Sequence, residues 1–217
     1  MNPSLVKRAE FVHAHTAIGR PPLVPEIALH LATEITPIWQ ASEAWLERLG
    51  VEPPFWAFAW PGAQALARRI LDDRALVRGR RVLDFAAGGG LAAIACAIAG
   101  AEVEAAEIDA MAIAAIEANA ALNDVRVTPF DGDVVGQEGR WDLILCGDVC
   151  YEGPMTRHIL PWLRSLAGDA EVWVADPGRA YLPTDGMVPL ATYDVPTTLE
   201  LEDRDSRRTT IYRLSAG

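Results

Sequence analysis

The sequence lacks the long apolar segments that a membrane protein needs. No run of about 18 residues is both apolar and free of charge, so no membrane span is predicted. The first residues, MNPSLVKRAEFVHAHT, mix charged and polar side chains and contain no apolar signal-peptide core. We therefore expect a cytoplasmic protein.

Cysteine is scarce, with only Cys96, Cys146 and Cys150. An odd number this small forms no disulfide framework and suits a reducing compartment. Cys146 and Cys150 have no second Cys/His pair to complete a zinc site, and His13 and His15 have no carboxylate partner in view. We predict buried structural thiols and no metal.

Long basic runs are also missing, and the formal net charge is −11. Such a surface repels polyanions, so no nucleic acid partner is expected, and a basic partner suits the charge better. Two short arginine groups, at residues 78–81 and 204–208, are interpreted as solvated loop charge.

Apolar periodicity divides the chain into two parts. Residues 1–54 are predicted to be a helical extension, with apolar stripes in IALHLATEI and WQASEAWLERLG broken by Pro37. Residues 55–217 are predicted to form one α/β domain, which opens on FWAFAWPG, a segment too rich in Trp and Pro for a helix. Helices are predicted at 62–73, 91–99, 110–122 and 158–166, and strands at 82–85, 102–108, 125–130, 142–146 and 171–175.

Strands separated by helices imply right-handed crossovers and a parallel sheet covered on both faces. At the C-terminus, TTLELE (197–202) and RTTIYRL (208–214) flank a polar turn, which predicts an antiparallel hairpin. A dehydrogenase-type nucleotide domain would continue with further strand–helix units instead.

The segment VLDFAAGGG (82–90) follows the first predicted strand and opens a helix. Its glycines allow a tight turn and a close approach to a ligand, but such turns also serve dinucleotides. Asp84 sharpens the prediction, because a carboxylate repels a pyrophosphate but attracts the ammonium group of S-adenosylmethionine. The spacing is Asp-x-Ala-x-Gly-x-Gly rather than Gly-x-Gly-x-x-Gly.

Further carboxylates follow the next two strands. Glu107 ends the second strand, where it can accept both ribose hydroxyls. Asp133 follows the third strand and can accept from the adenine amino group, with Asp131 as the competitor for that role. Because open sheets bind ligands at the carboxyl ends of parallel strands, this pattern predicts S-adenosylmethionine as the cofactor.

Residues 60–214 resemble the seven-β-strand methyltransferases, with Ala86 where the first motif of that superfamily usually has glycine. FAWPGAQALARRIL and GDVCYE resemble the family 16-type lysine methyltransferases. ADPGRAYLP and the C-terminal segment are similar to the branch that methylates the β-subunit of electron-transfer flavoprotein, whose bacterial members are also associated with ribosomal proteins. The resemblance implies a Rossmann-like seven-stranded fold, mostly parallel, with a C-terminal antiparallel hairpin.

The resemblance also assigns residues. Asp148 and Tyr151 match the family's acid-x-x-aromatic signature, and Trp60 matches the tryptophan that borders the cofactor pocket. The predicted cofactor-binding residues are Trp60, Asp84, Ala86, Gly88, Gly90, Glu107, Ile108, Asp133 and Gly147.

The residue after the fourth strand indicates which nitrogen is methylated. Enzymes acting on amide or adenine nitrogens show Asn-Pro-Pro-Tyr there, whereas this chain has Asp148-Val-Cys-Tyr151, and a carboxylate suits a lysine ammonium. Deprotonating lysine, pKa about 10.4, costs roughly 4 to 5 kcal/mol near pH 7, and a nearby Asp opposes it. We therefore predict that Asp148 captures and orients the amine; the proton acceptor stays open. Tyr151 either walls the lysine channel or packs as a half-buried aromatic.

Several alternatives stay open. Trp56 and Phe58 are predicted to pack, and Trp60 either covers the cofactor or packs. Arg179 contacts an acidic substrate or forms a structural ion pair. The predicted enzyme is a monomeric protein-lysine methyltransferase acting on an exposed lysine. A small-molecule methyltransferase, a nicotinamide-dependent oxidoreductase and an inactive binding scaffold are the rival functions.

Overall fold

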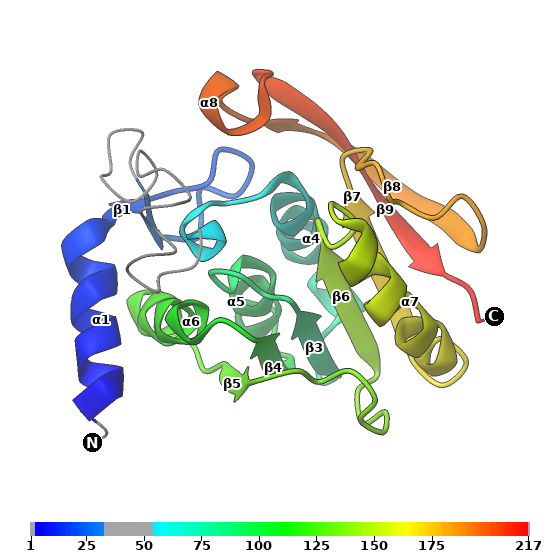
Figure 1. The fold of residues 1–217 in the computed structure, drawn as a ribbon, viewed down its shortest axis with the longest axis horizontal. Coiled ribbons are helices and arrows are strands. Elements are labelled where there is room, and N and C mark those ends of the chain that lie inside the picture. The colour runs from blue at the N-terminus through cyan, green and yellow to red at the C-terminus, as the bar shows by residue number, and fades with distance from the viewer. Residues whose placement is uncertain (1–2, 33–53, 217) are drawn as a thin grey trace.

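The computed structural model describes residues 3–32 and 54–216. Its centre is a seven-stranded sheet with the order β5-β4-β3-β6-β7-β9-β8 (Figure 1). The strands are β3 (Arg81–Phe85), β4 (Glu102–Glu107), β5 (Thr128–Asp131), β6 (Leu143–Gly147), β7 (Glu171–Asp176), β8 (Met187–Pro196) and β9 (Ser206–Leu214). Strands β3 to β7 pair in parallel, and β9 runs antiparallel to both β7 and β8. The predicted α/β fold is confirmed.

Helices cover both faces of this sheet. The helices of the described residues are α1 (Pro3–His15), α4 (Pro61–Asp72), α5 (Leu91–Ile98), α6 (Ala110–Leu122), α7 (Gly153–Leu166) and the single-turn α8 (Leu199–Glu202), with 3-10 turns η1 (Phe55–Ala57) and η2 (Arg74–Leu76). Pro61 begins α4, where its missing N–H costs nothing, and the Asp109 side chain caps α6 by accepting from Met111 N at 2.8 Å. No helix in the described part of the chain is long and apolar enough to cross a membrane.

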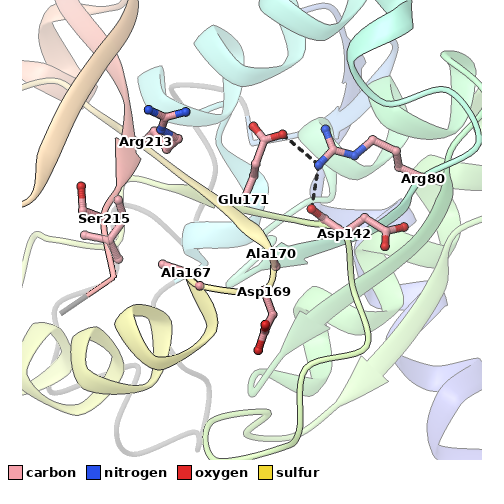
Figure 2. Close-up of a pocket in the computed structure, with 10 residues that line it drawn as sticks. Arg80, Asp142, Ala167, Asp169, Ala170, Glu171, Arg213 and Ser215 are labelled. Atoms are coloured by element: carbon pink, nitrogen blue, oxygen red, sulfur yellow. Dashed lines mark hydrogen bonds and ion pairs between the residues drawn. The ribbon is translucent and has the colours of Figure 1, made fainter.

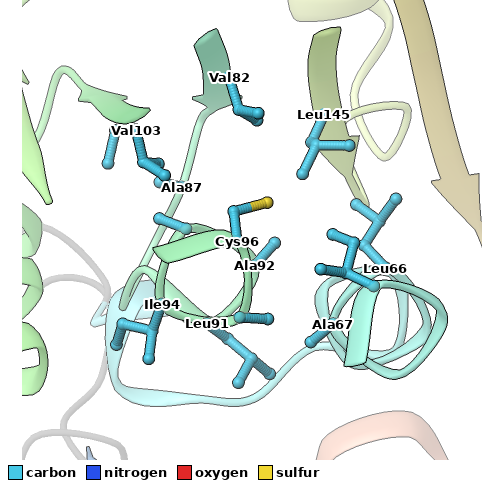
Figure 3. Packing of buried hydrophobic residues seen from close by; sticks show 14 of the residues in the cluster. Leu66, Ala67, Val82, Ala87, Leu91, Ala92, Ile94, Cys96, Val103 and Leu145 are labelled. Carbon is cyan, nitrogen blue, oxygen red and sulfur yellow. The ribbon is translucent and has the colours of Figure 1, made fainter. Parts of the chain in front are cut away.

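The core follows the two-residue period of the strands. Val82 and Leu145 face α4 and α5, where they meet Leu66 and Cys96 (Figure 3). The alternate positions, such as Leu83 of β3, face α7 on the other side of the sheet. Successive side chains of a strand point to opposite faces, so strands covered on both faces are apolar throughout. All three cysteines are buried and free, as predicted.

The sheet order places the chain reversal between β3 and β6. From β3 the chain runs outward through β4 to β5, then returns to β6 and continues to β7. The carboxyl ends of β3, β4 and β6 therefore meet at one edge around this switch point, which is where open α/β sheets bind ligands.

The N-terminal segment is only partly helical. Helix α1 is present, but the helical prediction for IALHLATEI was wrong at Leu29–Leu31, which forms β2 and pairs antiparallel with β1 (Ala17–Gly19). Side chains of α6 hold β2 extended, because Asn119 accepts from His30 N and Asn123 bonds the backbone of Ala28. The predicted helix at 39–50 lies outside the described residues, and the division at residue 54 stays a prediction.

The C-terminal hairpin exists, but its first strand was predicted in the wrong place. β8 ends at Pro196, and LELE forms α8 instead of a strand. Glu202 N donates to Thr198 O at 3.0 Å, which closes the turn, and the Glu202 side chain is buried against Arg179 and Arg207. The ion pair with the distant Arg179, together with that to the nearby Arg207, outweighs the local strand-like alternation.

Candidate active site

The loop after β3 needs backbone conformations that favour glycine. Ala86, Gly88 and Gly90 have φ of +53°, +55° and +78°. A Cβ added at Gly89 would lie 2.7 Å from Trp56 O, so this position accepts no side chain. The left-handed conformation of Ala86 explains why glycine is favoured there, since a Cβ in that region is strained.

Asp84 is more deeply buried than the sequence suggested. Its side chain is 3% exposed, and Oδ2 accepts from Ala93 N of α5 at 2.8 Å. Burial raises the pKa of Asp84 to about 8, against the opposing hydrogen bond from Ala93. The carboxyl group therefore ties the end of β3 to the first turn of α5, and its contact with an ammonium group stays a prediction.

Glu107 lies at the carboxyl end of β4 and joins two neighbouring loops. Oε1 accepts from Gly88 N at 2.8 Å, and Oε2 accepts from Ile108 N at 3.0 Å. Each carboxylate oxygen can accept a second hydrogen bond, which leaves capacity for hydroxyl donors. Ile108 follows Glu107 directly and is 77% exposed, so its side chain is open to a ligand at this edge.

Both candidate adenine acceptors follow β5. Asp131 pairs with Glu107 in the sheet register and is exposed. Asp133 accepts from Val135 N and from Nε2 of His158, both at 2.9 Å. Gly132 N donates to Glu107 O, which holds this turn against β4. The choice between the two acids stays open.

Asp148 follows β6 and is nearly enclosed. It has φ +56° and is 7% exposed. Oδ2 accepts from Gly62 N, and Oδ1 accepts from Nη2 and Nε of Arg179 at 2.7 and 3.1 Å. Burial raises the pKa of Asp148 to about 6, while the Arg179 charge opposes this rise. Asp148 is therefore ionised near neutral pH.

Two glycines allow α4 to approach the acid. A Cβ at Gly62 would lie 2.6 Å from Ala175 O, and one at Gly147 would lie 2.9 Å from Ala63 N. The first turn of α4 therefore packs directly against the ends of β6 and β7. Sequence reasoning missed Gly62, although the Pro-Gly pair at the helix start was a visible signal.

Arg179 forms structural ion pairs with Asp148 and Glu202, which was one of the two alternatives predicted for it. It also donates to both oxygens of Glu202, which is 3% exposed and accepts from Arg207 Nε at 2.9 Å. Asp176 shapes this turn, because Oδ1 accepts from Arg179 N at 2.6 Å. The sequence missed Glu202, and Arg207 is paired rather than solvated. A chain of alternating charges thus joins β6 to β9.

Three aromatic side chains form a connected group beside Arg179. The Phe55 ring centroid lies 6.0 Å from that of Trp60 and 6.1 Å from that of Tyr151, and Trp60 Nε1 donates to Phe55 O at 2.8 Å. Arg179 Cζ lies 5.9 Å from the Trp60 ring centroid. We call Phe55, Trp60 and Tyr151 the aromatic rim; Phe55 and Tyr151 are 46% and 48% exposed. Trp56 packs in the core against α6, as predicted.

A cavity of about 510 Å³ opens at the opposite edge of the sheet (Figure 2). It is lined by charged groups at the amino ends of strands, where Arg80 pairs with Glu171 at 3.1 Å and donates to Asp142 O. Arg81 pairs with Asp142 at 2.7 Å, so both arginines form ion pairs, while the Arg81 side chain stays 55% exposed to solvent. Ligands of open α/β sheets bind at carboxyl ends, so this cavity is separate from the candidate active site.

Known proteins match this chain in sequence and fold. A family model described as the methyltransferase small domain matches residues 60–148. The electron transfer flavoprotein beta subunit lysine methyltransferase of Xenopus laevis is 36% identical, over 93% of this chain and 85% of its own length. The ribosomal protein L11 methyltransferase of Wolinella succinogenes is 36% identical over 41% of this chain and 31% of its own length.

Solved structures agree on the fold. Magnesium protoporphyrin IX methyltransferase from Synechocystis PCC 6803 with bound SAH is 19% identical, covers 70% of this chain and 82% of its own, and has a TM-score of 0.53. At that identity the likeness concerns the fold alone. The extent of the sequence match to the Xenopus protein shows the family. The chain belongs to the electron transfer flavoprotein beta subunit lysine methyltransferases and is an S-adenosylmethionine-dependent enzyme.

Proposed function

We propose that this enzyme methylates a lysine side chain of the electron-transfer flavoprotein β-subunit. The observation that carries the proposal is the ionised Asp148 carboxylate at the end of β6. One of its oxygens pairs with Arg179, whose guanidinium lies near Trp60 of the aromatic rim. The named activity of the Xenopus relative supports the choice of substrate.

The residues at the carboxyl edge fit S-adenosylmethionine, which supplies the methyl group when bound. The turn of Ala86, Gly88 and Gly90 brings the backbone close to the ligand, beside the first turn of α5. Glu107 has acceptor capacity for the two ribose hydroxyls, and the exposed Ile108 side chain would cover the adenine ring.

Three other residues complete this assignment. Asp133 would accept from the adenine amino group, with Asp131 as the alternative. Gly147, which lets α4 pack against the end of β6, would lie beside the ligand at the carboxyl edge. Trp60 would border the methionyl end of the site, beside Arg179.

The substrate amine would bind at Oδ2 of Asp148. Within the described residues Oδ2 accepts one hydrogen bond, from Gly62 N, and a carboxylate oxygen can accept two. Methyl transfer needs the lysine nitrogen aligned with the sulfonium methyl group, so an acceptor that fixes the direction of the amine is sufficient. Phe55 and Tyr151 would exclude water from the lysine stem.

Arg179 would ease the deprotonation of the bound lysine. An isolated Asp next to an ammonium group raises the pKa of that group, whereas a guanidinium lowers it. Since Arg179 contacts the same carboxylate at 2.7 Å, the pair presents an oriented acceptor with little net charge. The amine is then held without being strongly stabilised in its charged form.

The test is to incubate the enzyme with S-adenosylmethionine labelled in the methyl group and purified electron-transfer flavoprotein. We expect label on β-subunit lysines, located by mass spectrometry. The Asp148→Asn variant should lose transfer by about 100-fold or more, as when a transition-state contact is removed, yet bind S-adenosylhomocysteine within about threefold of wild type. Binding of S-adenosylhomocysteine without any protein labelling would refute the lysine substrate.

Ribosomal protein L11 is the second candidate substrate, because the Wolinella relative is named for it. The same assay with L11, and with the low-mass fraction of a cell extract, separates the alternatives. Label on L11 alone would redirect the proposal to the ribosome, and label on metabolites alone would favour a small-molecule methyltransferase.

A further inference from the structure

One buried side chain joins the N-terminal hairpin to the glycine loop. Asn119 lies on α6 and is 0% exposed. Its Nδ2 donates to Gly89 O at 2.8 Å, and its Oδ1 accepts from His30 N of β2 at 2.7 Å. The two hydrogen bonds use opposite sides of one amide group, so β2 and the loop are held relative to each other.

Asn123, one helical turn later, makes a similar bridge that does not reach the loop. Its Oδ1 accepts from Ala28 N at 2.9 Å, and its Nδ2 donates to Ala28 O at 2.6 Å. Asn119 and Asn123 therefore both hold the same backbone segment to α6. Only Asn119 continues to the loop, through Gly89.

A second route links the hairpin to the same glycine. Ala32 N, just after β2, donates to Ala57 O at 2.8 Å, which places η1 next to β2. Trp56 O of η1 would lie only 2.7 Å from a Cβ at Gly89. The Gly89 backbone is thus enclosed between Asn119 and η1, and both are hydrogen-bonded to the N-terminal segment.

We propose that Asn119 is a positioning residue for cofactor binding, which makes the N-terminal hairpin part of the cofactor site. The inference rests on the proposed assignment of the 86–90 loop to S-adenosylmethionine. A loop held in its binding geometry spends less free energy on ordering when the ligand arrives. Losing the Asn119 donor leaves a buried Gly89 carbonyl unpaired, and the loop then relaxes away from that geometry. Because coupling is reciprocal, the bound cofactor also stabilises the hairpin.

The experiment measures the Kd of S-adenosylhomocysteine by calorimetry for wild type, Asn119→Ala and Asn123→Ala. We expect the Kd to rise about 10-fold or more for Asn119→Ala and to stay within about threefold for Asn123→Ala, as removal of one buried hydrogen bond at the loop implies. Urea unfolding checks that both variants are folded and similarly destabilised. Equal losses of affinity, or none in either variant, overturn the proposal.

Asn119→Asp provides a second variant, because it keeps the acceptor for His30 N but turns an oxygen toward Gly89 O. Its affinity should fall as for Asn119→Ala. If the Asn119 variants do not fold, hydrogen exchange on the wild-type protein decides. S-adenosylhomocysteine should then slow exchange of the His30 amide more than that of the Ala28 amide. Equal slowing, or none, contradicts the coupling, whereas a wild-type protein that does not bind S-adenosylhomocysteine contradicts the proposed site itself.

Discussion

Two nitrogens of Arg179 donate to the same oxygen of Asp148, Nη2 at 2.7 Å and Nε at 3.1 Å. The other oxygen of Asp148 faces the first turn of α4. The two oxygens of Asp148 therefore have different partners. Arg179 compensates the negative charge at Oδ1, and the hydrogen bond from Gly62 N orients Oδ2. The ion pair therefore affects both the stability of the fold and the chemistry proposed for the site.

Replacing Arg179 by methionine tests that relationship. The change leaves the buried Asp148 without a cationic partner and removes one of the two arginines paired with Glu202. We therefore expect the free energy of unfolding, measured in urea, to fall by about 3–5 kcal/mol. With the cation gone, the bound lysine should deprotonate at higher pH, which moves the alkaline rise of kcat up by about one pH unit. The exposed Arg204→Met variant is the control. An unchanged pH profile in a folded Arg179→Met enzyme would contradict the role given to this pair.

Glu107→Gln should weaken cofactor binding. The substitution replaces a charged acceptor by an amide whose nitrogen cannot accept, so one ribose hydroxyl loses its partner. We expect the Kd of S-adenosylhomocysteine to rise about 10- to 100-fold, since a hydrogen bond to a charged group contributes about 1.5–3 kcal/mol. Glu102→Gln, at the opposite end of β4, is the matched control and should bind as wild type does. Similar affinities for all three proteins would remove Glu107 from the cofactor site.

Ala86→Gly should stabilise the protein. The left-handed φ of +53° costs alanine about 1–2 kcal/mol, while glycine adds about 0.5–1 kcal/mol of unfolding entropy. We expect a net gain of up to about 1 kcal/mol in thermal or urea unfolding. The neighbouring Ala87→Gly lacks this relief and should lower stability instead. A destabilised Ala86→Gly variant would show that the methyl group contributes more through packing than it costs in strain.

Asp84→Asn should change how stability depends on pH. The folded pKa of Asp84 is raised to about 8, far above that of an unfolded aspartate, so the folded protein binds this proton more tightly. Its contribution to stability is present at low pH and is lost as the pH rises toward 8. Asparagine keeps the acceptor for Ala93 N but does not ionise. Between pH 5 and pH 8, the free energy of unfolding of the variant should therefore rise relative to that of wild type by at least about 2 kcal/mol.

Urea unfolding at several pH values in this window measures the effect. Asp169→Asn, which removes an exposed carboxylate, is the control. A difference between Asp84→Asn and wild type that stays constant with pH would mean that the folded protein keeps Asp84 ionised throughout.

Much of the parallel sheet could be predicted from local patterns. Strands β3, β6 and β7 are short apolar runs between helical periods, and burial on both faces requires that composition. The candidate acids at the ends of β3, β4 and β6 could also be located, because parallel strands bring their carboxyl ends to one edge. Those features depend on residues close together in the chain.

The elements that were predicted wrongly depend on distant partners. Strand β2 has a helix-like apolar stripe, but Asn119 and Asn123 hold its backbone extended. Segment 199–202 alternates like a strand, but the distant Arg179, together with the nearby Arg207, holds Glu202 inside a helical turn. In both places the tertiary contacts outweigh the local conformational preference, because burying a polar group without its partner costs more free energy than a few unfavourable backbone angles.

By itself, the sequence determined the fold class, the glycine loop and the acids of the candidate site, since period and spacing are local properties of the chain. Only the tertiary structure decided what each acid contacts. It enclosed Asp84, turned one oxygen of Asp148 toward Arg179 and connected His30 to Gly89 through Asn119. The reason is physical: these hydrogen bonds and ion pairs join atoms about 3 Å apart, and residues far apart in sequence come within that distance only when the chain has folded.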